Sequence, residues 1–240
     1  MSELFPINNA LLELAHWAGS HPARLVLGNE GSVAATLPGD LFAVSAAHTS
    51  LARLEAGSLV GFDLMKAQAL LSLEDLPPKA LAEAQTNPAA PAPSADALAF
   101  ADLFAFEGVQ FALHTQPIPV NQIACSPRAR QFTDRRNLPE EILACGQASV
   151  LVPFFPPGLA LAKEIRRRIA LWRDRYKAVP KLIVIQNHGM IAMGATVEEV
   201  QSVTEMAVKY AEIFVGAAML GGPEFLKPNY ITQIDATRLV

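Results

Sequence analysis

Each of two apolar, strand-like segments of this chain ends at a histidine. The first covers residues 109–117 and contains His114, and the second covers residues 181–189 and contains His188. An imidazole at the end of a buried strand is held rigidly at the rim of a sheet, and two such ends side by side present two neutral nitrogens to one divalent metal. One histidine alone is more often a hydrogen-bonded structural group, so the metal-site prediction depends on the pair.

The residues beside each histidine favour an abrupt end to the strand. Gly189 follows His188 directly and suits a tight turn that brings backbone close to a ligand. Pro117 lies three residues after His114 and cannot donate a hydrogen bond to a ladder. Both histidines are therefore expected at the ends of their strands, at the rim of a sheet.

Helical and strand-like stretches are interspersed along the chain. Helical spacing of apolar residues occurs at 8–18, 97–106, 159–176 and 196–220, and strand-like stretches occur at 25–27, 32–36, 41–44, 60–65, 150–154, 182–185 and 190–193. The strands near the amino terminus, separated by short turns, predict an antiparallel meander. Strands clustered between helices fit a layered α/β/α domain.

Composition and charge narrow the class of protein. The chain has 240 residues, of which 51% are hydrophobic and 18% charged, which is enough to form one core, so residues 1–240 are expected to form a single domain. A net charge of -4 argues against a nucleic-acid surface, because a phosphate backbone requires a basic face. No apolar run reaches the roughly 18 residues of a membrane span, and no basic, apolar leader is found. A soluble, cytoplasmic protein with no membrane partner is expected.

Six segments carry a resemblance to a known family. They are residues 25–32, 44–50, 93–96, 109–117, 152–158 and 186–194. Read together, they resemble the class II aldolase/adducin family, which includes metal-dependent sugar-phosphate aldolases and a pentose-phosphate epimerase. The resemblance implies a three-layer α/β/α sandwich with a mostly antiparallel central sheet, a small-molecule substrate and a homo-oligomer, commonly a tetramer.

The resemblance assigns a metal site and an acid/base group, with two departures from the family pattern. His114 and His188 match two of the family's metal-binding histidines, while Gln116 replaces the third. Zinc is the expected metal, with manganese or cobalt as alternatives, because an amide oxygen is a poorer zinc ligand than imidazole. Asp96 occupies the position of the family's catalytic Glu. Because Asp96 begins a predicted helix, an ordinary N-cap is an equal alternative to the catalytic role.

The resemblance also implies a set of substrate-binding residues. They are Gly31, Ser32, His48, Thr49 and Ser94. The family's glycine-rich loop is matched at Gly31-Ser32, although Gly28-Asn29 is an alternative, and the family's Ser-Gly turn is replaced by Ala47-His48. Losing a hydroxyl and a glycine at that turn removes groups that suit a phosphate, so a phosphorylated substrate is disfavoured.

Three functions are compatible with these residues. The first is a divergent metal-dependent lyase that cleaves a carbon-carbon bond of a hydroxy-carbonyl or sugar-derived substrate through a metal-stabilised enediolate, with epimerisation or decarboxylation as related reactions. The second is an inactive, adducin-like binding or assembly module. In the third, His48 completes a three-histidine metal site for a different substrate.

Overall fold

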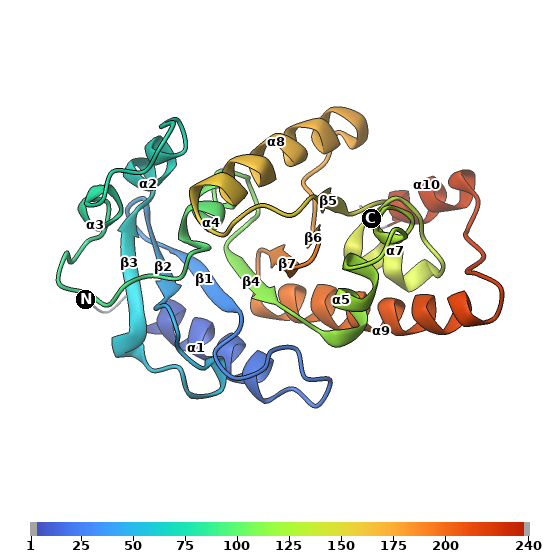
Figure 1. The fold of residues 1–240 in the computed structure, drawn as a ribbon, viewed down its shortest axis with the longest axis horizontal. Helices are drawn as coiled ribbons and strands as arrows, with labels where there is room; N and C mark the ends of the chain where they lie inside the picture. The colour runs from blue at the N-terminus through green and yellow to red at the C-terminus, as the bar shows by residue number, and fades with distance from the viewer. Residues whose placement is uncertain (1–3, 238–240) are drawn as a thin grey trace.

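The computed structural model describes residues 4–237 of the chain, and its central feature is one seven-stranded sheet. The strand order is β3-β2-β1-β4-β7-β6-β5, and Figure 1 shows these strands running through the middle of the molecule. The strands are β1 (Ser32–Leu37), β2 (Leu41–Ser45), β3 (Leu59–Asp63), β4 (Phe111–Thr115), β5 (Val150–Val152), β6 (Leu182–Ile185) and β7 (Gly189–Gly194). Within the described residues, β5 and β6 pair in parallel and all other neighbours are antiparallel.

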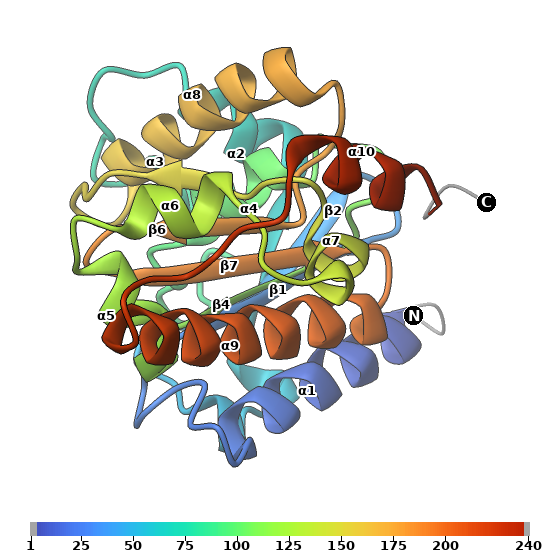
Figure 2. The same cartoon turned by 90° about the vertical axis from the view of Figure 1, so that its right-hand side faces the viewer.

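Helices cover both faces of the sheet. The helices are α1 (Leu4–Ser20), α2 (Leu64–Leu70), α3 (Ala80–Glu83), α4 (Ala97–Leu103), α5 (Ile118–Ala124), α6 (Ala129–Asp134), α7 (Pro139–Cys145), α8 (Leu159–Tyr176), α9 (Val197–Met219) and α10 (Pro228–Thr237). Figure 2 shows α1 and α9 on one side of the strands and α8 with α2 on the other. The expected three-layer α/β/α sandwich with a mostly antiparallel sheet is confirmed.

Two apolar cores, one on each face, hold these layers together. One core joins α1 and α9 to residues such as Leu113 and Val184, and the other joins α4 and α8 to residues such as Ala112 and Ile183. Successive residues of a strand point to opposite faces, so a strand covered on both sides must be apolar at every position. This explains why β6 is an unbroken apolar run, and it makes the buried His114 of β4 exceptional.

Most of the predicted elements appear close to their expected positions. The meander of β1, β2 and β3 is confirmed, as are the bounds of α8 and β6. The strand expected at 25–27 is wrong, because that segment is irregular. The segment is nevertheless hydrogen-bonded to the residue that follows β4, because the N–H of Gln116 donates to the carbonyl of Leu25 at 2.8 Å.

No helix within residues 4–237 combines the length and apolar character that crossing a bilayer demands.

Candidate functional site

The register of β1 against β4 places Ser32 directly opposite His114. Two residues further along these strands, Ala34 and Ala112 lie in the core beneath α4 and α8. Because side chains alternate along a strand, Ser32 and His114 point to that same face, where both are buried. Neighbouring strands therefore set a hydroxyl and an imidazole side by side under α4.

Asp96 reaches this pair from the start of α4. Its Oδ2 accepts hydrogen bonds from Ser32 Oγ at 2.6 Å, from His114 Nδ1 at 2.8 Å and from Ser94 Oγ at 3.3 Å. Asp96 occupies the N-cap position, but its side chain makes no cap hydrogen bond. The capping alternative is therefore wrong, because the carboxylate turns away from the helix and toward the two strands.

His188 completes the group from the turn between β6 and β7. Asn187 has a φ of 57° and Gly189 a φ of 150°, two left-handed residues that make the turn sharp. A side chain at Gly189 would have its Cβ 2.4 Å from the carbonyl oxygen of Thr115 and 3.1 Å from His114 Nε2. Glycine thus allows the turn to lie against the end of β4, as the sequence predicted.

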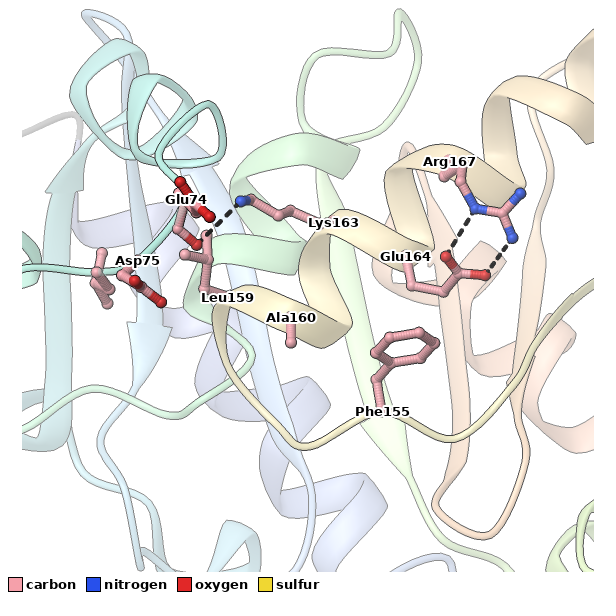
Figure 3. A pocket seen from close by; sticks show the side chains of 9 residues that line it. Glu74, Asp75, Phe155, Leu159, Ala160, Lys163, Glu164 and Arg167 are labelled. Carbon is pink, nitrogen blue, oxygen red and sulfur yellow. Dashed lines mark hydrogen bonds and ion pairs between the residues drawn. The ribbon is translucent and has the colours of Figure 1, made fainter.

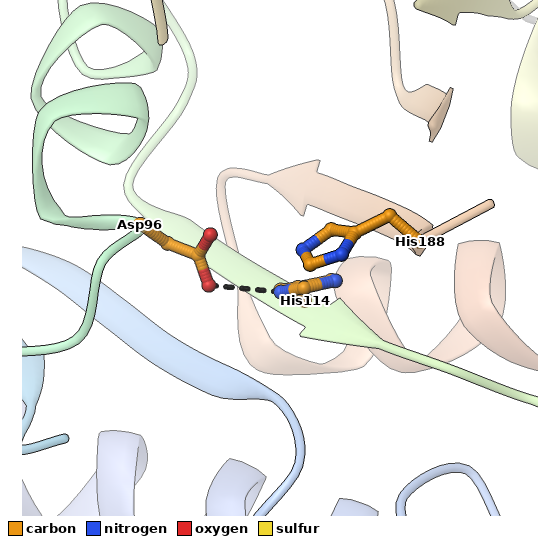
Figure 4. Close-up of side chains that lie close together, drawn as sticks. All are labelled: Asp96, His114 and His188. Carbon is orange, nitrogen blue, oxygen red and sulfur yellow. Dashed lines mark hydrogen bonds and ion pairs between the residues drawn. The ribbon is translucent and has the colours of Figure 1, made fainter. Parts of the chain in front are cut away.

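The resulting arrangement is a cluster of two imidazoles and one carboxylate. The rings of His114 and His188 have centroids 4.8 Å apart and planes tilted by 30°. One ligand atom from each of Asp96, His114 and His188 lies within 4.8 Å of the others. Figure 4 shows the His188 ring over the His114 ring, with the Asp96 carboxylate hydrogen-bonded to Nδ1 of His114.

His114 Nε2 is a buried atom that has no hydrogen-bond partner within residues 4–237. A buried polar atom without a partner costs about 1 to 3 kcal/mol, so such an atom in a native site calls for a ligand. Two imidazole nitrogens beside a carboxylate are donors that zinc and related divalent metals accept. The residues of this site therefore fit a divalent metal.

The electrostatics of the cluster favour the protonation states that bind metals. Burial alone would raise the pKa of Asp96, but the electrostatic interaction and hydrogen bond with His114, together with the hydrogen bond from Ser32, hold that pKa well below its usual range. Burial lowers the pKa of His188, as does its electrostatic interaction with His114, against an opposing effect of Asp96. The carboxylate is ionised and His188 is neutral at pH 7.

The other predicted residues lie in two places. Gly31 and Gln116 lie beside the cluster: a Cβ on Gly31 would be 2.7 Å from the His114 carbonyl oxygen, and one on Gly189 would be 3.0 Å from Gln116 Cγ. His48 and Thr49 lie on the turn after β2, and His48 is exposed. Among the described residues, the possible metal-binding group does not include His48.

The turn that carries His48 runs next to the segment of Ser94. Ala47 N–H donates to the carbonyl of Ala92 at 2.8 Å, and Ser94 N–H donates to that of Ser45 at 3.0 Å. His48 has a φ of 58°, a backbone conformation that costs a non-glycine residue about 1 to 2 kcal/mol. His48 therefore has a strained backbone, on a loop that is hydrogen-bonded to the segment of Ser94.

One part of the site was not predicted from the sequence. Ser32 and Ser94 were expected to bind substrate, and in the structure both hydroxyls donate to Asp96. The contact between Ser32 and Asp96 joins residues 64 positions apart, so no local spacing could show it. The only available signal was a serine at the start of an otherwise apolar strand.

A separate cavity of about 460 Å³ opens between the loop at residues 74–76 and α8, and no residue of the cluster lines it. Figure 3 shows that Lys163 donates to the backbone of Glu74 and that Glu164 is paired with Arg167. Within the described part of the chain, none of its lining side chains contains a buried polar atom without a partner. The cavity therefore has no polar group waiting for a ligand, in contrast to the histidine pair.

Comparisons with known proteins provide evidence on the family and the fold. A family model described as class II aldolase and adducin N-terminal domain matches residues 10–215. A comparison with curated protein sequences gives no significant match.

Solved structures share the fold at low sequence identity. A class II aldolase domain from Thermoplasma acidophilum is 23% identical with a TM-score of 0.65, covering 86% of this chain and 92% of its own. YgbL from Klebsiella pneumoniae, described as a putative aldolase/epimerase/decarboxylase, is 15% identical with a TM-score of 0.73, covering 96% and 98%. An L-fuculose 1-phosphate aldolase is 12% identical with a TM-score of 0.74, covering 98% and 97%. The TM-scores establish a shared fold.

Proposed function

Since the chain belongs to the class II aldolase and adducin family, we propose that it is a divalent-metal-dependent lyase that cleaves a carbon-carbon bond in a hydroxy-carbonyl substrate. The observation that carries the proposal is the buried, unpartnered His114 Nε2 beside the His188 ring. A family relative that had lost its metal would gain stability by replacing this nitrogen with an apolar group. No observation favours the adducin-like alternative.

His114 and His188 would hold the metal, with Gln116 as a neighbouring amide. When bound, the metal supplies a Lewis acid to the carbonyl and hydroxyl oxygens of the substrate. The fixed turn at Gly189 and the central position of β4 hold the two imidazoles rigidly, which reduces the reorganisation needed for binding. Zinc is the first choice because two of the donors are imidazoles, with manganese and cobalt as alternatives.

The substrate would reach the cluster past the turn of His48 and Thr49. The hydroxyls of Ser32 and Ser94 are engaged by Asp96, so they are not available as substrate donors. His48 is exposed and belongs to a loop that is bonded to the Ser94 segment. We assign it to the polar end of the substrate, and a bulky imidazole there disfavours a phosphate.

Three further expectations remain proposals. They are a single domain over residues 1–240, a homo-oligomer such as a tetramer, and a cytoplasmic location. None of them is needed for the metal test that follows.

The test is elemental analysis of protein purified without a histidine tag or chelator. We expect about one equivalent of divalent metal per chain, and none in His114→Ala or His188→Ala with the fold retained. His48→Ala is the matched control, since it removes an exposed histidine outside the cluster and should keep the metal. Metal that persists in both cluster variants would overturn the assignment, and metal lost from His48→Ala would favour a three-histidine site.

If metal is bound, screening of hydroxy-carbonyl compounds with and without phosphate is the next step. Cleavage of unphosphorylated compounds is the expected result. A strict requirement for phosphate would contradict the role given to His48.

A further inference from the structure

Asp96 and Ser32 face a metal-binding imidazole rather than open space. We infer that they form a positioning pair that fixes the tautomer of His114, with the proton on Nδ1 and the lone pair of Nε2 directed at the metal. Asp96 is then a positioning residue for that imidazole. This inference deepens the proposed function and rests on it for the metal itself.

The first support is that a single carboxylate oxygen receives all the donors. Asp96 Oδ2 accepts from Ser32 at 2.6 Å, from His114 Nδ1 at 2.8 Å and from Ser94 at 3.3 Å. Bonds of 2.6 to 2.8 Å to an ionised oxygen are of the strong, charge-assisted kind. These bonds direct Oδ2 of Asp96 at His114 and the two serines.

The second support is the way in which Asp96 is held. Its own N–H donates to Ser94 Oγ at 3.2 Å, and Ser94 Oγ donates in turn to the carboxylate. This local loop fixes the side chain, which is 8% exposed. Aspartate is one methylene shorter than the glutamate of the family pattern, and its carboxylate reaches Nδ1 of His114.

The third support is the state of the opposite ring nitrogen. His114 Nδ1 is bonded to the carboxylate, and the buried Nε2 has no hydrogen-bond partner within residues 4–237. A carboxylate that accepts from one ring nitrogen keeps the proton there and leaves the other nitrogen basic, and metal-binding histidines are usually oriented in this way. Ser32, directly opposite His114 in the sheet, sets the position of the carboxylate.

The decisive measurement is ¹⁵N NMR of the imidazoles in metal-free protein at about pH 8.5, above the ordinary histidine pKa of about 6.5. The signals of His114 are assigned by their loss in His114→Gln. We expect a protonated Nδ1 and an unprotonated Nε2 in the wild type. Asp96→Asn should weaken this preference, because an amide can donate to Nδ1 and shift the proton to Nε2.

Zinc affinity, measured by competition with a chromophoric chelator, is the second readout. Asp96→Asn should weaken zinc binding about 10- to 100-fold, the usual effect of removing such a partner, and Ser32→Ala should weaken it less. Ser32→Thr keeps the hydroxyl and should restore the affinity. Ser72→Ala is the matched control, because Ser72 is exposed and its hydroxyl bonds only locally, to the carbonyl of Ala69.

The two proposals fail in different ways. Wild-type protein that binds neither zinc, manganese nor cobalt overturns the proposed function, while the NMR measurement still decides the tautomer. A wild-type His114 protonated on Nε2 overturns the positioning pair, and so does an Asp96→Asn protein with unchanged tautomer and unchanged zinc affinity. If Asp96→Asn does not fold, Ser32→Ala and the wild-type spectrum carry the test.

Discussion

Gly31→Ala is expected to destabilise the protein much more than Gly39→Ala. Both glycines have a φ of 78°, so the backbone strain of adding a side chain, and the entropy removed from the unfolded chain, are matched between the two variants. The surroundings differ. A Cβ on Gly31 would lie 2.7 Å from the carbonyl oxygen of His114 and 2.7 Å from Val26 Cγ1, whereas one on Gly39 meets no atom within 4 Å.

The expected difference follows from this contact. A rigid backbone oxygen cannot move away as the end of a side chain can, so the full cost of overpacking, about 1 to 3 kcal/mol, falls on Gly31→Ala. For a chain of this length the same difference amounts to about 3 to 9 °C in Tm. The assay is urea and thermal unfolding of both variants at one protein concentration.

Equal loss of stability in the two variants would refute the reasoning. It would mean that β1 and the loop before it do not lie against the His114 carbonyl as described. A larger loss at Gly39 would be a stronger contradiction, since that turn is exposed.

Two further predictions concern buried and paired charges. Glu141→Gln should lower the free energy of unfolding, measured with urea at pH 7, by about 3 to 5 kcal/mol. The reason is that Arg136 is 1% exposed and would lose the negative charge that lies 3.4 Å away on Glu141. A decrease of less than about 1 kcal/mol would contradict this prediction. The hydrogen bond from Arg167, against the opposing effect of burial and with a further bond from Arg168, lowers the pKa of Glu164 from 4.5 to about 2. This depressed pKa stabilises the fold above pH 4.5, and the stabilisation is lost as the pH falls toward 2. The Arg167 side chain is 56% exposed, so solvent screens the pair. Glu164→Gln should therefore lower the free energy of unfolding by only about 1 kcal/mol at pH 7 and by almost nothing near pH 2. A decrease that does not change with pH would contradict the assignment.

The sequence predicted the elements of the fold where local patterns are strong. The unbroken apolar run of β6 and the helical spacing of α8 were located to the residue. It failed at residues 25–27, an apolar segment that forms no strand. Leu25 and Val26 are buried against other elements rather than paired in a strand, and a single sequence does not distinguish the two.

The helix start at Asp96 shows the same limit at the site. The sequence predicted the position of the residue but left capping and catalysis as equal alternatives. The fold decided against capping, because the register of β1 on β4 brings Ser32 and His114 beneath the carboxylate.

The sequence by itself therefore determined the layered fold and the two histidines at strand ends, because both follow from periodicity and from residue types a few positions apart. Only the tertiary structure decided that Asp96, Ser32 and His114 share one hydrogen-bonded cluster and that His188 lies over it, while His48 remains outside. The physical reason is that strand order and register join residues far apart in the chain. Those contacts depend on the packing of the whole sheet and leave no trace in local spacing.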